Sequence, residues 1–477
     1  MRLTRSVVSG LVRGRGAGLA GRTILGNMGA RAIALASVAV VTILVARAGG
    51  AEDVGLLALM RVLPGLVGVL AACGLPSAMG YFVAGEERSH PGLWPTILVI
   101  MGFGAAVGGV AWWALTPVIH DRLMPTTTTM VVAVVGVTVV TQLPVAVGKA
   151  CLQALGDSRG ANVIIAAEEA AFVPAYGIGW ALGLRSGWLL VTALIIADVV
   201  VAIGAWAWIW RDVHRAGDVT PGRPERALAG RLLRFGMRSQ VGGVVNLLNL
   251  RLDVVLLGAF AGPAPVGIYV VASKFAELLR LPSLALTWVA YPRVAQEGAA
   301  NFARRAQGAV TPLLGLGSAA ALVVGLVAFP LLPLAYGSEF AAATWPAALI
   351  ALGLVAEPAA GLASGYLMGS GRPGVNSVIL GVGLIVTVVL DVVLIPRHGA
   401  IGAAVASAVA YLTTDLVLIA AMRRVIHSSP PPDVHRDRSR TVTLESPPPT
   451  SMSIGRGPDR WPATADPPRP PSSGVAT

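Results

Sequence analysis

Charged side chains are scarce in this sequence. Asp, Glu, Lys and Arg together make up 13% of its 477 residues, about half of the roughly 25% that is usual in soluble domains. Hydrophobic residues account for 55%, and the mean hydropathy is +0.73. A compact soluble fold has too little interior for so much apolar surface, which excludes an ordinary soluble enzyme. The same surface is sufficient for about twelve spans of roughly 20 residues each, so we predict an all-α, multi-pass membrane protein.

Cysteine and lysine are almost absent. The two cysteines, Cys73 and Cys151, have neither a disulfide nor a zinc-site spacing, so we expect no metal site. The two lysines, Lys149 and Lys274, fall in apolar stretches, and the arginines lie mainly in short loops between such stretches. A nucleic-acid binder needs a solvated basic face. The net charge of +12 therefore indicates membrane topology and no nucleic-acid partner.

Motifs of ATP hydrolysis and of catalysis are also missing. Gly148-Lys149 is followed by Ala150 and lacks the upstream glycine of a Walker A motif. No long loop is predicted on the outer side, where a polysaccharide polymerase or ligase needs its catalytic loop. We therefore predict that the protein is not an enzyme, and we expect no cofactor beyond a coupling H⁺ or Na⁺.

The apolar runs predict twelve transmembrane helices. Their approximate limits are 27–47, 54–83, 93–116, 127–151, 161–182, 187–210, 237–260, 265–290, 309–335, 343–369, 374–396 and 399–422. Prolines interrupt several runs, and a proline removes a backbone hydrogen bond and kinks a helix. These prolines are Pro64, Pro144, Pro282, Pro330, Pro333 and Pro358.

The loop arginines predict the orientation, because cytoplasmic loops are enriched in Arg and Lys. Nineteen arginines fall on the side that holds both termini. Four fall on the other side, namely Arg47, Arg122, Arg185 and Arg397. Both termini are therefore predicted to be cytoplasmic.

The spans divide into two lobes of six. The predicted parts are a basic cytoplasmic N-terminus (1–26), an N-lobe (27–210), a cytoplasmic linker (211–236), a C-lobe (237–422) and a disordered, Pro-rich cytoplasmic tail (423–477). Within the linker, residues 224–235 have the pattern of a basic amphipathic helix at the membrane interface.

The two lobes contain a sequence repeat. Gly156, Arg159 and Pro144 recur at a nearly constant offset as Gly369, Arg372 and Pro358. Six spans per repeat give both lobes the same orientation. We therefore expect the lobes to be related by an axis along the membrane normal, with a central cavity and the substrate path between them.

Ionisable side chains within the spans are the candidate functional residues, because each costs about 2.5 kcal/mol or more at a helix centre. The cations are Arg31, Arg61, Lys149, Arg251, Lys274 and Arg280. The acids are Glu168, Glu169, Asp198, Asp253, Glu277, Glu357, Asp391 and Asp415.

The cations differ in their neighbours along the chain. Arg61 has no acidic neighbour on its own helix, so we expect it to bind a ligand phosphate. Lys274 is followed by Glu277 and Arg280 in i, i+3 steps, which fits either a self-neutralising ladder or an anion site at Lys274. Arg31 and Lys149 lie near helix ends, where long side chains can snorkel to the interface.

Span 237–260 also has a polar stripe. Asn246, Asn249 and Asp253 share one helical face and are predicted to face the lobe interior or the central cavity. The candidate substrate-binding residues are therefore Arg31, Arg61, Asn246, Asn249, Arg251 and Lys274. The candidates for ion coupling or charge pairing are Glu168, Glu169, Asp198, Asp253, Glu277 and Glu357.

Six short segments follow each other in a specific order. They are Gln153–Gly156, Arg251–Gly258, Val266–Tyr269, Ala290–Arg293, Tyr336–Phe340 and Leu394–Ala404. In this order they resemble the Wzx-type polysaccharide flippases of the multidrug/oligosaccharidyl-lipid/polysaccharide exporter (MOP) superfamily, over about residues 22–425. The N-terminus lacks the Ser-Arg-x-x-Gly-x-x-Arg-Asp signature of lipid II flippases, which argues against that branch.

The resemblance implies two helical lobes around a V-shaped cavity, alternating access and a polyprenyl-diphosphate-linked oligosaccharide as substrate. Basic cavity residues correspond by position to Arg61, Arg251 and Lys274. We therefore predict a flippase that moves this lipid from the cytoplasmic to the outer leaflet of a bacterial inner membrane for cell-surface polysaccharide biosynthesis. A polysaccharide polymerase or glycosyltransferases are its expected protein partners, and the lipid bilayer is its environment.

Two other functions stay open. One is a cation- or drug-extruding antiporter of the same superfamily, which favours an acidic cavity free of cations. The other is a non-transporting membrane scaffold that acts through its Pro-rich tail. A scaffold is expected to pair every buried charge and to have no open polar cavity.

Overall fold

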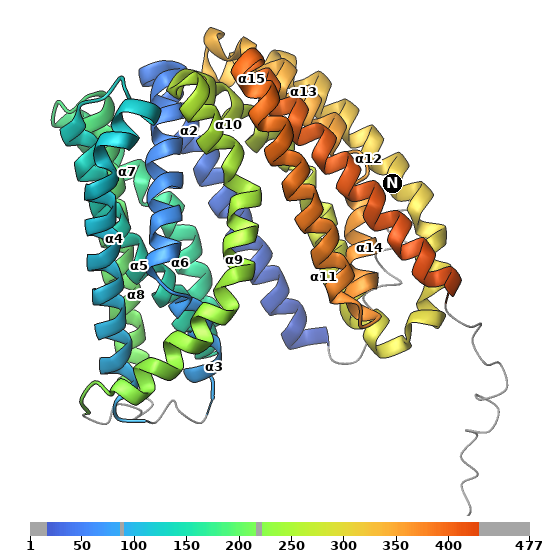
Figure 1. Cartoon of the computed structure of the whole chain (residues 1–477), viewed down its shortest axis with the longest axis horizontal. Coiled ribbons are helices and arrows are strands. Elements are labelled where there is room, and N and C mark those ends of the chain that lie inside the picture. The colour runs from blue at the N-terminus through green and yellow to red at the C-terminus, as the bar shows by residue number, and fades with distance from the viewer. Residues whose placement is uncertain (1–16, 86–89, 216–221, 429–477) are drawn as a thin grey trace, which may run out of the picture. The chain divides into compact units, whose positions relative to one another are not determined.

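The computed structural model describes residues 17–85, 90–215 and 222–428, and every regular element in these ranges is a helix (Figure 1). The elements are α2 (Ala17–Ala71), α3 (Leu75–Phe82), α4 (Leu93–Leu123), α5 (Thr129–Ala154), α6 (Ser158–Ala170), α7 (Phe172–Ala181), α8 (Ser186–Arg215), α9 (Arg226–Ala261), α10 (Pro263–Glu277), α11 (Arg280–Glu297), α12 (Ala299–Tyr336), the 3₁₀ helix η2 (Ser338–Ala343), α13 (Thr344–Gly353), α14 (Glu357–Gly369) and α15 (Pro373–Ser428). The predicted all-α fold is confirmed.

Seven helices in the described ranges are long and apolar enough to cross a membrane, or eight when the bent pair Ser338–Gly353 and Glu357–Gly369 is counted as one span. Two of the seven contain a break at a glycine with positive φ: Gly50 (φ 70°) in α2 and Gly399 (φ 52°) in α15. Side chains other than glycine rarely adopt this conformation. Each break falls at the boundary between two predicted spans. The chain is a multi-pass membrane protein, and the total of twelve spans stays a prediction.

Other breaks fall inside predicted spans. Span 161–182 is divided into α6 and α7, and span 265–290 into α10 and α11. Pro282 and Pro358 lie in the first turns of α11 and α14. Backbone N–H groups in the first turn form no hydrogen bond within the helix, so a proline there removes none. The other four prolines lie inside helices that continue through them, namely Pro64, Pro144, Pro330 and Pro333.

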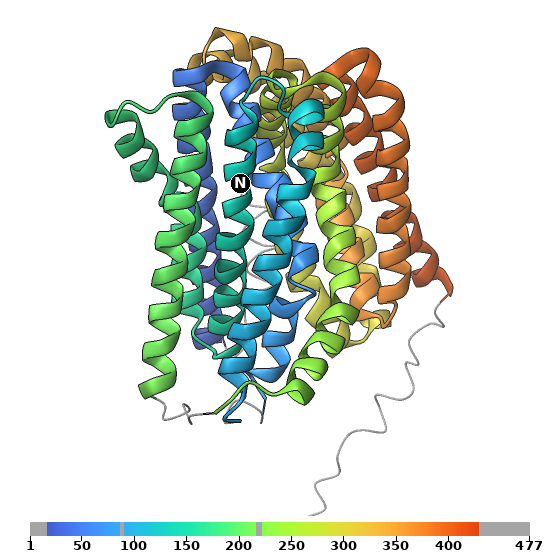
Figure 2. The same ribbon diagram turned by 60° about the vertical axis from the view of Figure 1, so that its left-hand side comes forward.

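The linker region differs from the prediction. Residues 224–235 do not form a separate amphipathic helix, because α9 runs without a break from Arg226 into span 237–260. Leu228 and Leu232 are buried in the same core cluster as Trp94 of the N-lobe. The apolar face of this segment therefore packs on protein, and the helix continues into the C-lobe (Figure 2).

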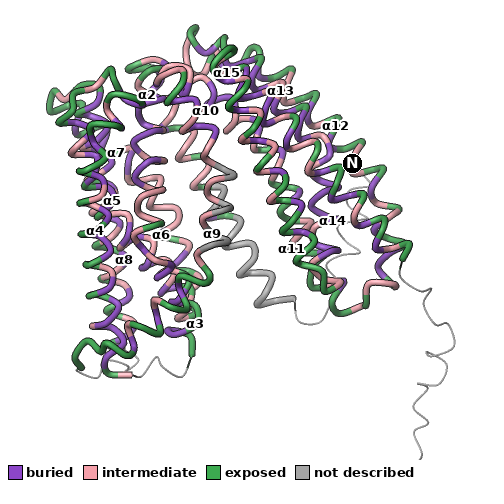
Figure 3. The backbone as a smooth tube through the Cα atoms, viewed as in Figure 1, coloured by how far each residue is buried: buried purple, intermediate pink, exposed green. Residues whose placement is uncertain are grey.

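The buried apolar residues form three clusters. One contains residues of both lobes, such as Leu57, Val266 and Ala351. The second consists of N-lobe helices and the start of α9, and the third of α11, α12, α14 and α15. Figure 3 shows the buried stretches along these helices. The shared cluster flanks the loops on the predicted outer side, so the lobes have a common core at that end and separate cores at the other.

Within the C-lobe, α14 packs against α11 through three glycines spaced by four residues. A Cβ at Gly361, Gly365 or Gly369 would lie 2.5 Å, 2.9 Å or 2.6 Å from a backbone oxygen of α11. Small residues in this spacing let membrane helices approach closely. Backbone oxygens cannot rotate away, so these positions have no room for a side chain.

This packing predicts that Gly361→Ala lowers the free energy of unfolding by about 1–3 kcal/mol, as is typical of overpacking. The measurement is the melting temperature of the purified protein in detergent. Gly381→Ala is the matched control, since no heavy atom lies within 4 Å of a Cβ there, and alanine favours the helix. Equal melting temperatures of the two variants would contradict the close approach of α14 to α11.

Candidate functional site

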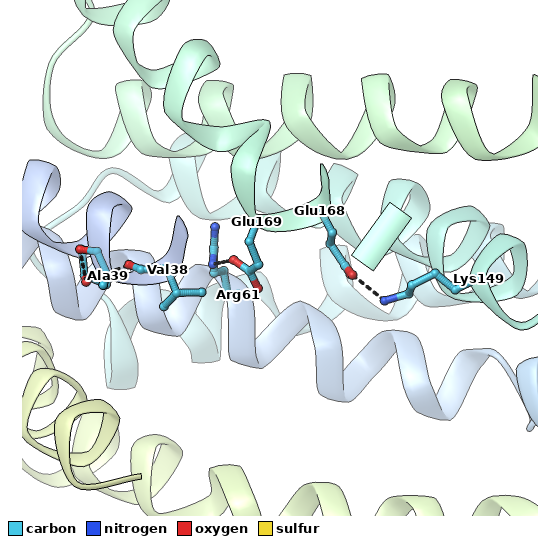
Figure 4. Close-up of polar contacts among 7 residues, drawn as sticks. Val38, Ala39, Arg61, Lys149, Glu168 and Glu169 are labelled. Atoms are coloured by element: carbon cyan, nitrogen blue, oxygen red, sulfur yellow. Dashed lines mark hydrogen bonds and ion pairs between the residues drawn. The ribbon is translucent and has the colours of Figure 1, made fainter. Parts of the chain in front are cut away.

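Two adjacent carboxylates end α6 and bind cations from two other helices. Glu169 Oε2 lies 2.6 Å from Arg61 Nη1 of α2, and Glu168 Oε2 lies 2.5 Å from Lys149 Nζ of α5. Figure 4 shows the two pairs side by side. Consecutive residues of a helix point in different directions, which lets these two acids reach different neighbours. The four side chains form a connected charged group inside the N-lobe.

These pairs are accessible. About a quarter of the Arg61 and Lys149 side chains is exposed, 26% and 25% respectively. The Arg61 guanidinium also lies 5.3 Å from the centre of the Phe172 ring, a favourable cation–π distance. The same lobe contains Asp198 of α8, which accepts a hydrogen bond from Thr141 Oγ1 at 3.2 Å. Glu168, Glu169 and Asp198 thus each have a polar partner.

The C-lobe contains a second charged group near the break between α10 and α11. Lys274 Nζ lies 2.8 Å from Glu277 Oε2 within the last turn of α10. Arg280 Nε lies 3.5 Å from Glu357 Oε1 of α14. Of the predicted ladder Lys274–Glu277–Arg280, only the pair of Lys274 and Glu277 is present, because Arg280 pairs with an acid of another helix.

Asp253 is buried and accepts hydrogen bonds from its surroundings. Tyr269 Oη of α10 donates to Asp253 Oδ2, and the backbone N–H of Val254 donates to Oδ1 at 2.7 Å. Tyr269 Oη lies 2.9 Å from Ser407 Oγ of α15. The predicted interior position of Asp253 agrees with this burial.

A cavity of about 220 Å³ lies between α11, α14 and both halves of α15. Its wall includes Arg280, Glu357, Tyr411 and Asp415, together with the hydroxyl groups of several serines and threonines. Asp415 Oδ2 is buried without a hydrogen-bond partner in the described part of the chain, as are both carboxylate oxygens of Asp391. A buried polar atom without a partner is costly, so these acids are the clearest unsatisfied groups of the C-lobe.

The other predicted residues have different outcomes. Arg251 is partly buried and forms no ion pair with any described residue. The side chains of Arg31, Asn246 and Asn249 lie outside the described residues. Lys149, for which snorkelling to the interface stays a prediction, is bound by Glu168. Arg61 pairs with Glu169 of α6 and not with the acids of α2, Glu52 and Asp53, which lie more than two turns away from it along the helix.

Four residues of these polar groups were not among the predicted site residues, namely Tyr269, Asp391, Ser407 and Asp415. Asp391 and Asp415 were visible as acids within spans, but nothing local distinguishes an unpartnered acid from a paired one. No local pattern connects Tyr269 with Ser407, because they lie far apart in the chain and meet only through packing.

Comparison with known proteins identifies the family. The profile of a family described as polysaccharide biosynthesis protein matches residues 23–297, more than half of the chain. The chain belongs to the polysaccharide biosynthesis protein family. The region that matches this family contains all four residues of the N-lobe charged group and, of the C-lobe group, all but Glu357.

This family member is similar to a probable low-salt glycan biosynthesis flippase, Agl15, of Haloferax volcanii. The two sequences are 22% identical over 199 residues, 41% of this chain and 42% of the relative. The matched stretch thus spans less than half of the length of that curated relative.

Two of the solved structures with a similar fold are described by their conformation. One is the lipid II flippase MurJ in an inward closed conformation (TM-score 0.66, 13% identity, 84% of this chain and 87% of that chain). The other is the inward-facing conformation of a multidrug resistance MATE family transporter of the MOP superfamily (TM-score 0.66, 15% identity, 83% and 94%). This polysaccharide biosynthesis protein therefore has the fold of MOP-superfamily transporters, and the similar proteins are flippases and transporters.

The pair of Arg61 and Glu169 yields a double-mutant prediction. Glu169→Gln or Arg61→Gln alone leaves a partly buried charge without its partner and is expected to lower the free energy of unfolding by about 1–3 kcal/mol, less than for a fully buried pair. The double variant is expected to lose less than the sum of the two. The measurement is thermal unfolding in detergent.

The control for this cycle is the pair of Glu297 and Arg305. Its atoms lie 2.7 Å apart, but 61% of the Arg305 side chain is exposed, and exposed pairs contribute about 0–1 kcal/mol. Additive effects of the two substitutions at Arg61 and Glu169 would show that the pair is not coupled.

Proposed function

We propose that this family member flips polyprenyl-diphosphate-linked oligosaccharides from the cytoplasmic to the outer leaflet of a bacterial inner membrane by alternating access. The family description and the names of two similar proteins support this proposal, since one is a glycan biosynthesis flippase and the other a lipid II flippase. A polysaccharide polymerase or glycosyltransferases in the same membrane would use or supply the lipid.

The observation that supports the proposal most directly is the set of partly exposed cations within the spans. Arg61, Lys149 and Lys274 are each about three-quarters buried, and each is bound by a single carboxylate. Phosphate oxygens form strong, charge-assisted hydrogen bonds with such cations, and arginine can bind them in pairs. An incoming diphosphate can therefore replace the carboxylates, which would be released to water on the exposed side.

Arg251 supports the same substrate. It is partly buried and forms no ion pair among the described residues, so binding a phosphate there requires no displacement. A diphosphate head group cannot cross the hydrocarbon layer bare, because ionised groups lose their hydration there. A membrane potential that is negative inside assists outward movement of the anion by about 2.3 kcal/mol per charge per 100 mV.

Alternating access is supported by the distribution of buried residues. The lobes share one apolar cluster at the predicted outer end and have separate clusters elsewhere. Relative movement of the lobes then disturbs one shared interface and leaves the two lobe cores intact. Two of the solved structures with a similar fold are described as inward conformations, which agrees with an outer end that is closed.

The proposal predicts that Arg61→Ala, Arg251→Ala or Lys274→Ala slows flipping by about 10–100-fold, because each substitution removes a charge-assisted hydrogen bond to phosphate. The measurement is the rate at which a labelled polyprenyl-diphosphate oligosaccharide reaches the outer leaflet of cells that carry only the variant. Arg122→Ala is the control, since it removes an exposed arginine at the predicted outer side.

The same experiment distinguishes flipping from the two alternative functions, drug extrusion and a scaffold. Accumulation of the labelled lipid on the cytoplasmic face, with loss of surface polysaccharide, would support flipping. Normal surface polysaccharide together with lost drug resistance would support a drug-extruding antiporter. No change in either would support a scaffold.

The proposed transport cycle also includes a coupling cation. Glu168 and Glu169 are neutralised by Lys149 and Arg61, whereas Asp391 and Asp415 have buried oxygens without partners in the described part. Burying an unpaired carboxylate is so costly that it takes up a proton or a cation. The C-lobe acids are therefore the better candidates for binding the H⁺ or Na⁺ that enters during the cycle.

Asp391→Asn and Asp415→Asn are expected to abolish the response of flipping to an imposed gradient, since an amide needs no neutralising ion. The measurement compares initial flipping rates in vesicles under a pH gradient, a Na⁺ gradient or neither. Asp121→Asn, at an acid whose side chain is 73% exposed, should respond like the unchanged protein. A gradient response retained in both C-lobe variants would rule these acids out as the coupling site.

A further inference from the structure

Two helix ends from opposite lobes cap each other at the predicted outer end. Arg47 of α2 donates from Nε to the carbonyl oxygen of Ala335 at 2.9 Å and from Nη2 to that of Leu334, in the last turn of α12. Glu339 of η2 accepts at Oε2 a hydrogen bond of 3.1 Å from the backbone N–H of Ala51. We call Arg47 and Glu339, with these backbone partners, the outer clasp.

The polarity of the outer clasp matches the helix ends it joins. The last carbonyls of a helix and its first N–H groups have no partner within the helix, and a helix favours a cation at its C-terminus and an anion at its N-terminus. Arg47 is the cation at the end of α12. Glu339 is the anion at Ala51, where the second half of α2 begins after the break at Gly50.

The cap at Ala51 is not supplied locally, although an acid is nearby. Asp53 lies two residues further along α2 and instead accepts a hydrogen bond from Ser186 Oγ at 3.1 Å within the N-lobe. Both contacts of the outer clasp join residues almost 290 positions apart. A contact that only stabilised the bend in α2 would not need the other lobe.

Directly beside the outer clasp, the two lobes approach at backbone distance. A Cβ at Gly55 of α2 would lie 1.8 Å from the carbonyl oxygen of Pro263, and one at Gly267 of α10 would lie 1.9 Å from that of Ala51. The lobes therefore cannot separate at this end without breaking the outer clasp. Arg47 and Glu339 are themselves exposed, so water can replace their contacts when they part.

We propose that the outer clasp is a releasable latch that holds the outer end closed and sets the fraction of molecules whose outer end is open. This inference rests on the proposed alternating access, but it concerns the conformational equilibrium and not the substrate. The apolar cluster beneath contains buried residues of both lobes. The outer clasp adds directional contacts that form only when α2 and α12 are in register.

The test measures opening directly in the full chain. Val266 is completely buried in the shared cluster, so Val266→Cys, in a Cys73→Ser background, provides a thiol that a membrane-impermeant maleimide reaches from outside only when this end opens. The chain without Val266→Cys gives the background from the buried Cys151. The labelling rate then reports the open fraction.

Arg47→Ala and Glu339→Ala are each expected to increase the labelling rate about twofold to fivefold, as for other charges at helix ends. The double variant is expected to show about the product, roughly 4–25-fold, because the two caps are separate contacts. Arg122→Ala and Asp121→Ala remove exposed charges at the same predicted end and should leave the rate unchanged. Labelling at the control rate in the double variant would overturn the proposal.

Two further measurements keep the test decisive. If the alanine variants fail to accumulate, Arg47→Lys and Glu339→Gln preserve side-chain size and should give smaller increases in the same direction. A cleavable bismaleimide between Arg47→Cys and Leu334→Cys should stop labelling and flipping until it is cleaved. If the clasp variants are labelled faster but no lipid-linked oligosaccharide is flipped, the result would support the role of the outer clasp and refute the proposed substrate.

Discussion

The cost of placing an ionised side chain in hydrocarbon governs this molecule. With so few charged residues in the chain, those within the spans must each be neutralised, hydrated or placed in a polar cavity. The structure neutralises six of them across helix boundaries: Arg61 pairs with Glu169, Lys149 with Glu168 and Arg280 with Glu357. These pairs connect α2, α5 and α6 in one lobe, and α11 and α14 in the other.

The same constraint underlies the proposed roles of these charged groups. In the N-lobe the acids bind cations that stay partly exposed, which suits the exchange of a carboxylate for a phosphate. In the C-lobe, Asp391 and Asp415 retain oxygens without partners in the described part, which suits the uptake of a proton or a cation. In the proposed cycle, the anionic head group binds cations of both lobes, including Lys274 of the C-lobe, and the neutralising cation binds Asp391 and Asp415.

Much of the architecture was predictable because hydropathy is a local property. The apolar runs indicated where helices lie, and glycines with positive φ at Gly50 and Gly399 divide the two longest ones near the predicted boundaries. The start of α9 was mispredicted for a physical reason. An amphipathic pattern shows that one face is buried but not what covers it, and here Leu228 and Leu232 pack on the N-lobe and not on lipid.

The sequence by itself determined the helical class, the multi-pass character and the identity of the charges that need partners, since composition and spacing along one chain are sufficient for these. Only the tertiary structure decided which charge meets which. Glu169 lies 108 residues from Arg61, and the caps of the outer clasp come from the opposite lobe. Such pairings depend on the rotation and packing of whole helices, and no local pattern records them.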